Sequence, residues 1–489
     1  MIPAPISGLL DRVGGLCVDS AFERGSGAPV PVHDPSTGTE LTRLAAAGPD
    51  DVDRAVGAAA AAFRGAWGKA GPAARADALA ALAAVVQAHA DELALLEAVN
   101  AGKPLAQARG ELGFAVQTLR YFAGTPLRPA GEVNPSGPDT FCYTDRIPLG
   151  VCAGIVPSNY PLLLAVWKLA AALAYGNTVV LKPAEETPLS LLRLAELAGT
   201  AGLPPGAFSV VSGGPEVGAA LCRHRKVAAV SFTGSVPAGR AVGALCGQEI
   251  KPVSLELGGK SPVVVCADAD LDLVVPAVLA GSTGNTGQMC VATGRVLVDR
   301  SRYGELAERL TAAAARLRVG GALDDATQLG PMVSAAGRDR VLDYVRLGVE
   351  EGACLQGAPY RPPEVAGAPG GYYVRPAVFA GADTRMRIAR EEIFGPVLVL
   401  SPFDSEQEAL AAALDTPFGL AASVWTRDAG RARRFARDLR AGMVWVNTLG
   451  DTEAPVSVGG LGLSGFGREL GVHAAEQYTV TRSVWIGQG

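Results

Sequence analysis

The chain has 489 residues, and its 43 basic and 48 acidic side chains give it a formal net charge of −5. Because a domain usually holds about 100–200 residues, this length predicts two or three domains with ample core. A composition of 49% hydrophobic and 19% charged residues excludes a disordered or fibrous chain, and the mild acidity without long runs of like charge argues against nucleic acid as a partner.

The first fifteen residues carry no basic cluster, and Asp11 stands where a signal peptide would be apolar. The longest apolar segment, residues 169–181, lies between Lys168 and Lys182 and is shorter than the roughly 20 residues that cross a bilayer. We therefore expect a cytoplasmic protein with no membrane association.

The eight cysteines show no CxxC spacing, and the four histidines show no metal-ligand spacing such as HExxH. This pattern predicts neither a disulfide framework nor a metal site. His89 lies in helical phase with Leu82, Val86 and Leu93, which is typical of a histidine at the edge of a helix core.

Scaffold elements are expected first along the chain. A stretch with hairpin character precedes a helix over 51–66, and one longer helix is expected from about 73 to 99. The second helix follows Pro72 and ends before the Gly and Pro of AGKP, which are typical helix stop signals.

From residue 151 the pattern changes to short apolar runs that alternate with helical segments. Continuous apolar strands separated by helices predict a parallel sheet covered on both faces, a doubly wound α/β domain. The expected strands lie near 151–156, 178–181, 208–211, 227–232 and 253–257, with helices near 162–174, 188–201, 215–222 and 236–245.

A second α/β region is expected after residue 260. Its helices are predicted near 270–284 and 301–318, and its strands near 294–299, 396–401, 422–426 and 443–446. Residues 355–371 are rich in Gly, Pro and Ala, which is typical of a surface loop.

Two glycine patterns have different contexts. Gly460, Gly462 and Gly465 satisfy GxGxxG but follow a loop, without the strand and helix that a dinucleotide motif requires. The segment FTGSVPAG, residues 232–239, follows an apolar strand and begins a helix, where backbone N–H groups suit a pyrophosphate. The spacing alone leaves open an ordinary turn.

A series of short sequence motifs, spread over about 330 residues, resembles the motifs of the aldehyde dehydrogenase superfamily and occurs in the same order. These segments begin with IVPSNYP and LKPAEE within residues 155–190 and continue with FTGS (232–235), LELGGK (255–260), GQMC (287–290), EEIFGPV (391–397), PFGLAASV (417–424) and SGFGRELG (464–471).

The resemblance implies three regions. It places an NAD-binding domain at 1–125 and 149–258, a catalytic domain at 259–471, and a small β arm at 126–148 and 472–489. The arm would hold together a homodimer or homotetramer.

The resemblance also assigns three catalytic residues. Cys290, in a turn after Gly287, would be the nucleophile, although a cysteine in isolation is usually inert. Glu256, partly desolvated at a strand end, would be the general base, whereas the residues alone favour an ordinary strand-end carboxylate paired with Lys260. Asn159, in a turn rigidified by prolines, would share an oxyanion site with the Cys290 N–H.

Cofactor residues follow from the same resemblance. Lys182 and Glu185 would contact the adenosine ribose, and Glu185 would favour NAD over NADP because its carboxylate repels a 2′-phosphate. Gly234, Ser235 and Gly239 would lie around the cofactor phosphates. Glu392 would hold the nicotinamide ribose, and Phe394 would pack beside the nicotinamide.

The substrate is an aldehyde whose class the sequence leaves open. Tyr160 and Trp167 resemble the aromatic wall of the betaine-aldehyde and aminoaldehyde branch, where cations meet aromatic faces. Val458 stands where that branch often has Trp. Asp451 and Glu453 are placed to attract a cation or are simply solvated, so both charged and neutral aldehydes remain candidates.

The implied reaction proceeds through a thiohemiacetal and a thioester on Cys290, with water activated by Glu256 releasing a carboxylic acid. A CoA-acylating aldehyde dehydrogenase is one alternative, which Glu256 disfavours. Others are a redox-silent cysteine hydrolase or transferase, which would need a partnering base, and a silent scaffold, which the retained Asn159, Glu256 and Cys290 disfavour.

Overall fold

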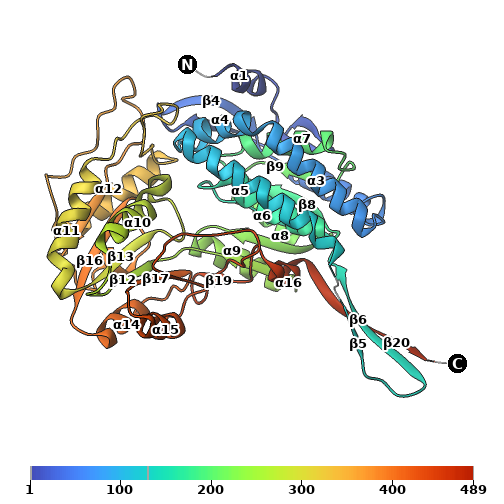
Figure 1. Cartoon of the computed structure of the whole chain (residues 1–489). Coiled ribbons are helices and arrows are strands. Elements are labelled where there is room, and N and C mark those ends of the chain that lie inside the picture. Colours follow the sequence, from blue (N-terminus) through green and yellow to red (C-terminus); the bar gives the residue numbers. More distant parts are fainter. Residues whose placement is uncertain (1–2, 129–130, 488–489) are drawn as a thin grey trace.

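The computed structural model describes residues 3–128 and 131–487. Residues 1–2 of the predicted cofactor domain and residues 129–130 and 488–489 of the predicted arm lie outside this range. Two large sheets with their helices form the body of the molecule, and a narrow β arm projects from it (Figure 1). The α/β fold class predicted from the sequence is confirmed.

The first sheet has eight strands in the order β19-β11-β10-β7-β8-β9-β1-β2. The five predicted strands run parallel at its centre, as β7 (Val151–Ile155), β8 (Thr178–Lys182), β9 (Phe208–Val211), β10 (Val227–Thr233) and β11 (Val253–Glu256). At the edges, β1 (Gly15–Val18) pairs antiparallel with β9 and with β2 (Ala21–Arg24), and β19 (Gly465–Phe466) pairs antiparallel with β11.

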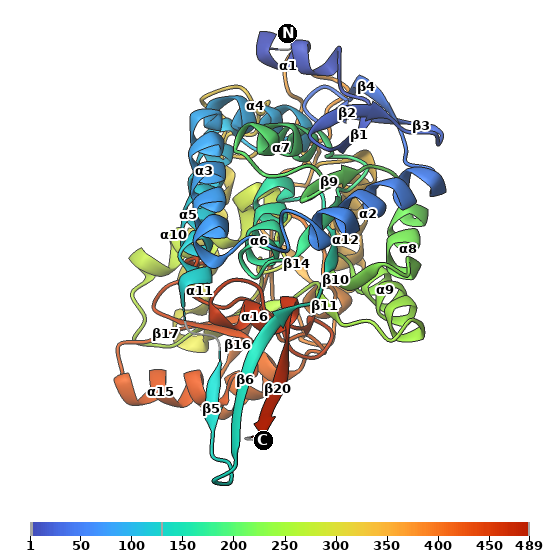
Figure 2. The ribbon, with the colours of Figure 1, turned by 90° about the vertical axis from the view of Figure 1, so that its right-hand side faces the viewer.

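Helices cover both faces of this sheet. Successive residues of a strand point to opposite faces, and both sets of side chains are therefore buried. Cys152, Val179 and Leu181 belong to the core beneath one group of helices, whereas Ala153 and Val180 belong to the core beneath the other. Figure 2 shows α3 and α5 on one side of the sheet and α8 and α9 on the other. The helices that follow the central strands are α6 (Pro161–Ala174), α7 (Leu189–Thr200), α8 (Pro215–Arg223) and α9 (Val236–Gln248).

The prediction of one helix over 73–99 is wrong. The chain forms α3 (Pro72–Ala88) and α4 (Ala90–Ala101), bent by 68° at His89. His89 has φ −106° and ψ 16°, outside the α-helical region, so it interrupts the regular helix. No single helix in the described ranges is long and apolar enough to cross a membrane, although α3 and α4 together meet the length and composition criteria.

The other N-terminal elements frame these helices. The expected hairpin character is confirmed by β1 with β2 and by β3 (Pro29–Asp34) with β4 (Thr39–Ala45). The remaining elements of this part are α1 (Ala4–Leu10), α2 (Pro49–Arg64), α5 (Leu105–Ala123) and the short η1 (Thr125–Leu127).

The second sheet has seven strands in the order β14-β15-β16-β13-β12-β17-β18, all parallel except β14. Its strands are β12 (Ser261–Val265), β13 (Thr293–Asp299), β14 (Cys354–Leu355), β15 (Ala377–Ala380), β16 (Val397–Phe403), β17 (Ala421–Trp425) and β18 (Met443–Val446). Its helices are α10 (Leu271–Thr283), α11 (Arg300–Ala315), α12 (Ala335–Glu350), α13 (Arg387–Arg390), α14 (Glu406–Leu414) and α15 (Ala429–Asp438).

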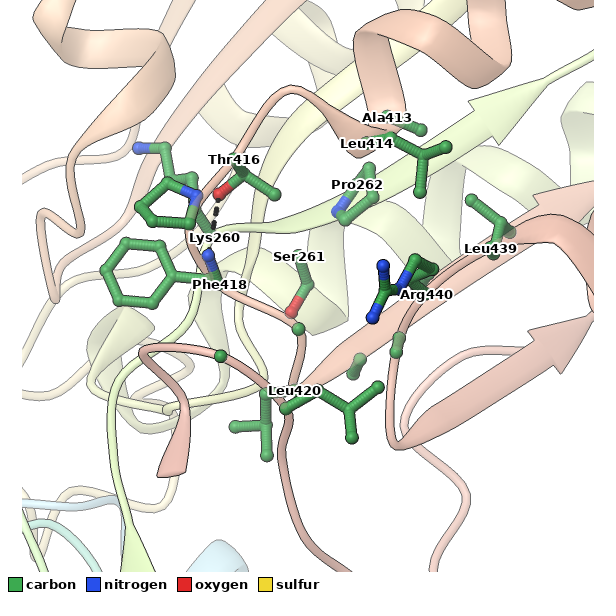
Figure 3. A pocket seen from close by; sticks show the side chains of 17 residues that line it. Lys260, Ser261, Pro262, Ala413, Leu414, Thr416, Phe418, Leu420, Leu439 and Arg440 are labelled. Atoms are coloured by element: carbon green, nitrogen blue, oxygen red, sulfur yellow. Dashed lines mark hydrogen bonds between the residues drawn. The ribbon is translucent and has the colours of Figure 1, made fainter. Parts of the chain in front are cut away.

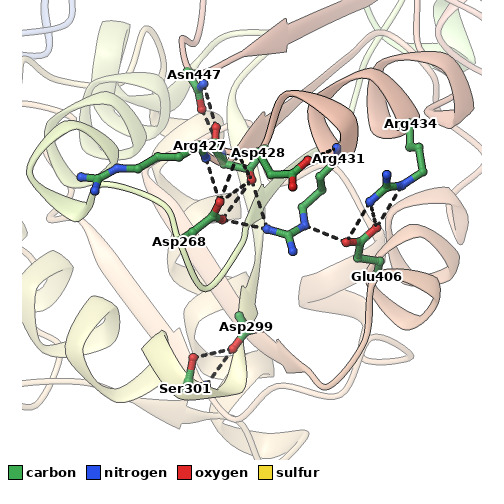
Figure 4. Close-up of polar contacts among 10 residues, drawn as sticks. Asp268, Asp299, Ser301, Glu406, Arg427, Asp428, Arg431, Arg434 and Asn447 are labelled. Carbon is green, nitrogen blue, oxygen red and sulfur yellow. Dashed lines mark hydrogen bonds and ion pairs between the residues drawn. The ribbon is translucent and has the colours of Figure 1, made fainter.

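A polar network lies at the carboxyl end of this second sheet (Figure 4). Asp268, after β12, accepts hydrogen bonds from Thr426 Oγ1 at 2.9 Å and from Arg431 Nη1 at 2.9 Å. Arg431 also donates through Nε to Glu406 Oε1 at 2.7 Å. These groups satisfy one another and tie α14 and α15 to the strand ends, so we assign them a structural role.

The arm is a three-stranded antiparallel sheet in the order β20-β6-β5. Its long strands β6 (Thr140–Pro148) and β20 (Thr479–Gly487) pair from Thr479 opposite Pro148 to Gly487 opposite Thr140, with β5 (Glu132–Asn134) on the outer edge. The short η3 (Val472–Ala474) and α16 (Ala475–Tyr478) lead into β20. Large exposed apolar side chains gather on this arm: Val133, Phe141, Val480, Trp485 and Ile486.

Candidate active site

One cavity of about 1540 Å³ lies at the carboxyl ends of the parallel strands in the first sheet. The register brings these ends together, because Ile155 pairs with Lys182 and with Phe232, and Thr233 pairs with Glu256. Doubly wound sheets bind their ligands at this edge. The candidate residues that line the cavity are Asn159, Tyr160, Trp167, Lys182, Glu185, Gly234, Ser235, Glu256, Cys290, Glu392, Phe394 and Val458.

Gly239 is the cofactor candidate that does not line the cavity. A Cβ atom at Gly239 would lie 2.4 Å from Leu257 Cδ2, so the glycine lets α9 pack closely on the chain after β11. Gly465 of the GxGxxG segment has a similar role, because a Cβ there would lie 1.9 Å from the Leu255 carbonyl oxygen. Both glycines therefore serve close packing of the backbone.

Cys290 follows a strained turn, the short helical segment η2 (Gly284–Gly287). Asn285 and Thr286 have φ of 46° and 56°, a left-handed conformation that side chains other than Gly rarely adopt. Asn285 Nδ2 donates to the Asn159 carbonyl oxygen at 2.8 Å, and Thr286 Oγ1 donates to the Gly330 carbonyl oxygen at 2.9 Å. These bonds hold the turn and thereby fix the position of Cys290.

The buried position of Cys290 favours the neutral form of its thiol. Burial first, and then the charges of Glu392 and Glu256, raise its pKa to about 12, although the backbone N–H groups of Cys290 and Val291 act in the opposite direction. A thiolate is the reactive form of cysteine. Nucleophilic attack therefore requires a nearby proton acceptor or a positive charge brought by a ligand.

Asn159 is the residue placed to donate a hydrogen bond beside this thiol. Its side chain is buried, and Nδ2 donates to the Gln288 carbonyl oxygen at 2.7 Å. A carboxamide nitrogen carries two hydrogens, so the second is free for a developing oxyanion. The carboxamide is held by the same turn that presents Cys290, which couples the two positions.

Glu256 ends β11 with its carboxylate buried in the cavity wall, and its Oε1 has no hydrogen-bond partner among the described residues. Burial first, and then the charge of Glu469, raise the pKa of Glu256 well above its ordinary value, while Lys168 and Arg468 lower it. A carboxylate with a raised pKa is a better proton acceptor from water near neutral pH.

Behind Glu256 lies a buried ion pair that the sequence analysis missed. Lys168 on α6 contacts Glu469, and its Nζ also donates to Thr233 Oγ1 at 2.8 Å. Only tertiary structure reveals this pair, because 301 residues separate its members in the chain.

Lys260 is not the partner of Glu256 that the residues alone allowed. Burial and the charge of Arg295 lower the pKa of Lys260 to about 7, with Glu392 opposing them. Lys260 lines a second cavity of about 380 Å³, together with Ser261, Thr416 and Phe418 (Figure 3). Phe418 also lines the large cavity, so this segment forms part of the wall between them.

Lys182 and Glu185 both line the large cavity. Burial lowers the pKa of Lys182, which Glu185 opposes, and burial raises the pKa of Glu185, which Lys182 opposes. Ser235 lines the same cavity as the N-cap of α9, where its Oγ accepts a hydrogen bond from Ala238 N at 3.4 Å. The positive end of a helix dipole there suits a phosphate.

Glu392 and Phe394 line the cavity as well, and the charge of Glu392 acts on the Cys290 thiol. The Gly259 N–H donates to Glu392 Oε1 at 3.1 Å, and a Cβ at Gly258 would lie 2.1 Å from Glu392 Oε2. Arg340 of α12, which the sequence analysis missed, donates to the Glu392 carbonyl oxygen at 2.6 Å and so fixes this segment. The cavity lining thus combines the carboxylates of Glu185 and Glu392 with the N-terminus of α9, a donor and acceptor set that fits a dinucleotide.

The remaining part of the cavity is lined mainly by apolar side chains. Phe114 and Trp167 meet edge to face with ring centroids 5.9 Å apart, and Tyr160, Met289 and Leu449 join them in the lining. This arrangement suits an apolar organic group.

The acidic residues proposed to attract a cation lie elsewhere. The side chain of Asp451 is exposed and accepts a hydrogen bond from Thr448 Oγ1, and Glu453 is exposed as well. Neither residue lines the cavity, although their neighbours Gly450 and Thr452 do.

Comparison with known proteins agrees with this arrangement. A family model described as the aldehyde dehydrogenase family matches residues 22–484. The chain is 44% identical to phenylacetaldehyde dehydrogenase of Pseudomonas fluorescens, covering 97% of this chain and 95% of the relative. It is 43% identical to a betaine aldehyde dehydrogenase of Cereibacter sphaeroides, covering 96% of each.

Solved structures of other aldehyde dehydrogenases also have the same fold as this chain. The NAD⁺ complex of an aldehyde dehydrogenase from Bacillus cereus superposes with a TM-score of 0.96 at 38% identity, covering 100% of this chain and 99% of that one. A betaine aldehyde dehydrogenase from Staphylococcus aureus in complex with NAD⁺ gives a TM-score of 0.95 at 33% identity, with 99% and 97% coverage.

Proposed function

The chain belongs to the aldehyde dehydrogenase family, and from this premise we propose that it oxidises an aldehyde to a carboxylic acid with NAD, using Cys290, Glu256 and Asn159. The observation that carries the proposal is that these three side chains line one cavity, next to groups that fit a dinucleotide. The CoA-acylating and redox-silent alternatives are not favoured by the family match.

The reaction begins at Cys290. Its thiol loses a proton to solvent, and the sulfur forms a bond to the aldehyde carbon while the carbonyl electrons move to oxygen. Asn159 Nδ2 and the Cys290 N–H stabilise that oxyanion. When bound, NAD⁺ supplies the hydride acceptor that oxidises this adduct to a thioester.

Glu256 then acts on water. Its carboxylate takes a proton as the water oxygen attacks the thioester carbon, the C–S bond breaks, and the carboxylic acid leaves. The proton on Glu256 then returns to the Cys290 sulfur, which restores the resting thiol. Two easier steps thereby replace one difficult oxidation. Lys182, Glu185, Ser235, Glu392 and Phe394 are proposed to hold the cofactor along the cavity.

A panel assay tests this function. Purified protein is given phenylacetaldehyde, hexanal, betaine aldehyde, 4-aminobutyraldehyde or succinic semialdehyde with NAD, with and without CoA. We expect NADH and free acid without CoA. Strict dependence on CoA would favour the acylating alternative, and no NADH with any aldehyde would contradict the proposal.

The cavity supports a neutral apolar aldehyde over an ammonio-aldehyde. Val458 supplies no aromatic face, and Asp451 and Glu453 lie outside the lining. The ring of Tyr160 is already near a cation, since Lys103 Nζ lies 4.8 Å from its centroid. In the panel we expect kcat/KM for phenylacetaldehyde to exceed that for betaine aldehyde, and the reverse order would contradict this substrate class.

Glu185 supports NAD as the preferred cofactor. Its carboxylate, which lines the cavity together with Lys182, would accept hydrogen bonds from a ribose 2′-hydroxyl and repel a 2′-phosphate. We expect Glu185→Gln to raise kcat/KM with NADP by about tenfold, since removing one charge repulsion is worth roughly 1.4 kcal/mol. Steady-state kinetics with both cofactors measure this, with the exposed Glu249→Gln as control, and an unchanged NADP/NAD ratio would contradict the assignment.

The raised pKa of Glu256 gives the activity a pH dependence. Because the base must be ionised, the hydrolytic step is lost as pH falls through this raised pKa. Glu469 raises the pKa of Glu256, so Glu469→Gln is expected to move the acid limb of the kcat profile to lower pH. A limb that stays in place or moves upward would show that Glu256 does not control it.

We also propose that the arm mediates assembly into a homodimer or homotetramer. Its exposed side chains Phe141, Val480 and Ile486 share one face of the arm in the strand register, an apolar surface of the kind that a second copy would cover. Light scattering that detects only monomer would contradict this proposal. The cytoplasmic location stays a prediction from the sequence.

A further inference from the structure

The strained turn before Cys290 is held by a residue from a distant helix. The backbone N–H of Asn285 donates to Gln107 Oε1 at 3.0 Å, across 178 residues of sequence. Asn285 is the first of the two left-handed residues in this turn. An unsatisfied N–H in a buried segment is costly, so this bond helps to maintain the strained conformation.

The amide of Gln107 has one orientation that satisfies both of its partners. Its Nε2 donates to Glu111 Oε1 at 3.1 Å, while its oxygen accepts from the Asn285 N–H. A carboxylate accepts and a backbone N–H donates, so reversing the amide would break both bonds.

A buried charge cluster fixes Glu111 in turn. Lys103 Nζ donates to Glu111 Oε2 at 2.5 Å and to Glu97 Oε2 at 3.0 Å. The side chain of Lys103 is fully buried. Because a buried ammonium needs its carboxylate partners, this cluster is a rigid support for Gln107.

The same turn is also connected to Asn159, the proposed oxyanion donor. Three side-chain amides donate hydrogen bonds to backbone carbonyl oxygens in this connection. Asn285 Nδ2 donates to the Asn159 carbonyl oxygen at 2.8 Å, and Asn159 Nδ2 donates to the Gln288 carbonyl oxygen at 2.7 Å. Gln288 Nε2 donates back to the Asn285 carbonyl oxygen at 3.0 Å. A shift of Asn285 would therefore move Asn159 and the segment that carries Cys290 together.

We propose that Gln107 is a positioning residue for the reaction, which acts through Asn285 on the oxyanion donor Asn159 and on Cys290. Gln107 does not line the cavity, so it acts without touching substrate or cofactor. This inference rests on the proposed function for its kinetic effect. Its structural effect, on the Asn285 N–H, is independent of any substrate.

The test compares two variants with a matched control. Gln107→Met keeps the length of the side chain but removes both hydrogen bonds, and Gln107→Glu keeps the oxygen that accepts from Asn285. Gln87→Met alters an exposed glutamine on α3. Kinetics, thermal unfolding and hydrogen exchange of the peptide 283–290 are measured for each.

We expect Gln107→Met to lower kcat by about 10- to 100-fold with KM for NAD changed less than about twofold, because small displacements at a catalytic centre cost this much. Exchange of peptide 283–290 should be faster. Gln107→Glu should recover part of the kcat and of the protection, and Gln87→Met should match the wild type.

Wild-type kcat together with unchanged exchange in Gln107→Met would overturn the proposal. If Gln107→Met does not fold, Gln107→Glu is the decisive variant. The loss of kcat expected for Gln107→Met, found in Gln107→Glu together with a peptide 283–290 that is not protected from exchange, would then overturn the proposal. If the wild type oxidises no aldehyde, faster exchange in Gln107→Met still supports the positioning of the turn, and the failure then belongs to the proposed function alone.

Discussion

Replacing Cys290 with alanine is expected to abolish NADH formation with every aldehyde, a loss on the order of 10⁴-fold or more, as for other enzymes that lose their nucleophile. The physical reason is that no other thiol of the described chain lines the large cavity. Without the sulfur the aldehyde has no covalent partner, and Asn159 has no oxyanion to stabilise. Steady-state NADH absorbance measures the loss.

Cys354→Ala is the matched control, because Cys354 is an exposed thiol remote from the cavity. It should keep wild-type activity. Both variants should bind NAD with unchanged affinity, since the residues proposed to hold the cofactor are intact. Residual turnover above about 1% in Cys290→Ala would mean that another group initiates the reaction.

Glu256→Gln is expected to separate the two halves of the reaction. Oxidation should still yield close to one NADH per active site in a burst, after which turnover should be slower by about 10²- to 10⁴-fold, the usual contribution of a general base. Glutamine keeps the shape of the side chain but cannot accept a proton from water. Stopped-flow absorbance resolves the burst from the steady state.

Glu249→Gln, at an exposed position, provides the control and should show neither change. Loss of the burst together with the steady state would show that Glu256 is indispensable for activating the Cys290 thiol. Unchanged turnover would remove Glu256 from the mechanism altogether.

The first sheet was predictable because its strands are continuous apolar runs bounded by helices. Its five parallel strands lie within one residue of their expected ends, since burial on both faces leaves little ambiguity about where such strands begin and stop. The segment FTGSVPAG spans, as expected, the end of β10 and the first turn of α9.

Other elements escaped prediction for identifiable reasons. The strand β12 contains Pro262, and a proline usually argues against a strand. The helix α15 has one buried residue, Phe435, and therefore no apolar stripe along the helix. The break at His89 lies within a segment whose apolar residues keep a helical spacing on both sides, so periodicity alone does not reveal the bend.

The sequence motifs identified most of the candidate residues that line the cavity, because residues at the ends of neighbouring parallel strands converge on one edge of the sheet. What they could not supply were contacts between distant segments. Lys168 meets Glu469, and Gln107 meets Asn285, only once helices of one part of the chain pack against loops of another. No local pattern marks such partners, and they determine the electrostatics and the rigidity of the site.

The most direct test is to trap the acyl group on Cys290. Glu256→Gln protein is mixed with NAD and phenylacetaldehyde, quenched in acid after the burst, and digested for mass spectrometry. We expect a phenylacetyl thioester on the peptide that carries Cys290, in an amount equal to the NADH formed. NADH formed in the burst with Cys290 unmodified would contradict it.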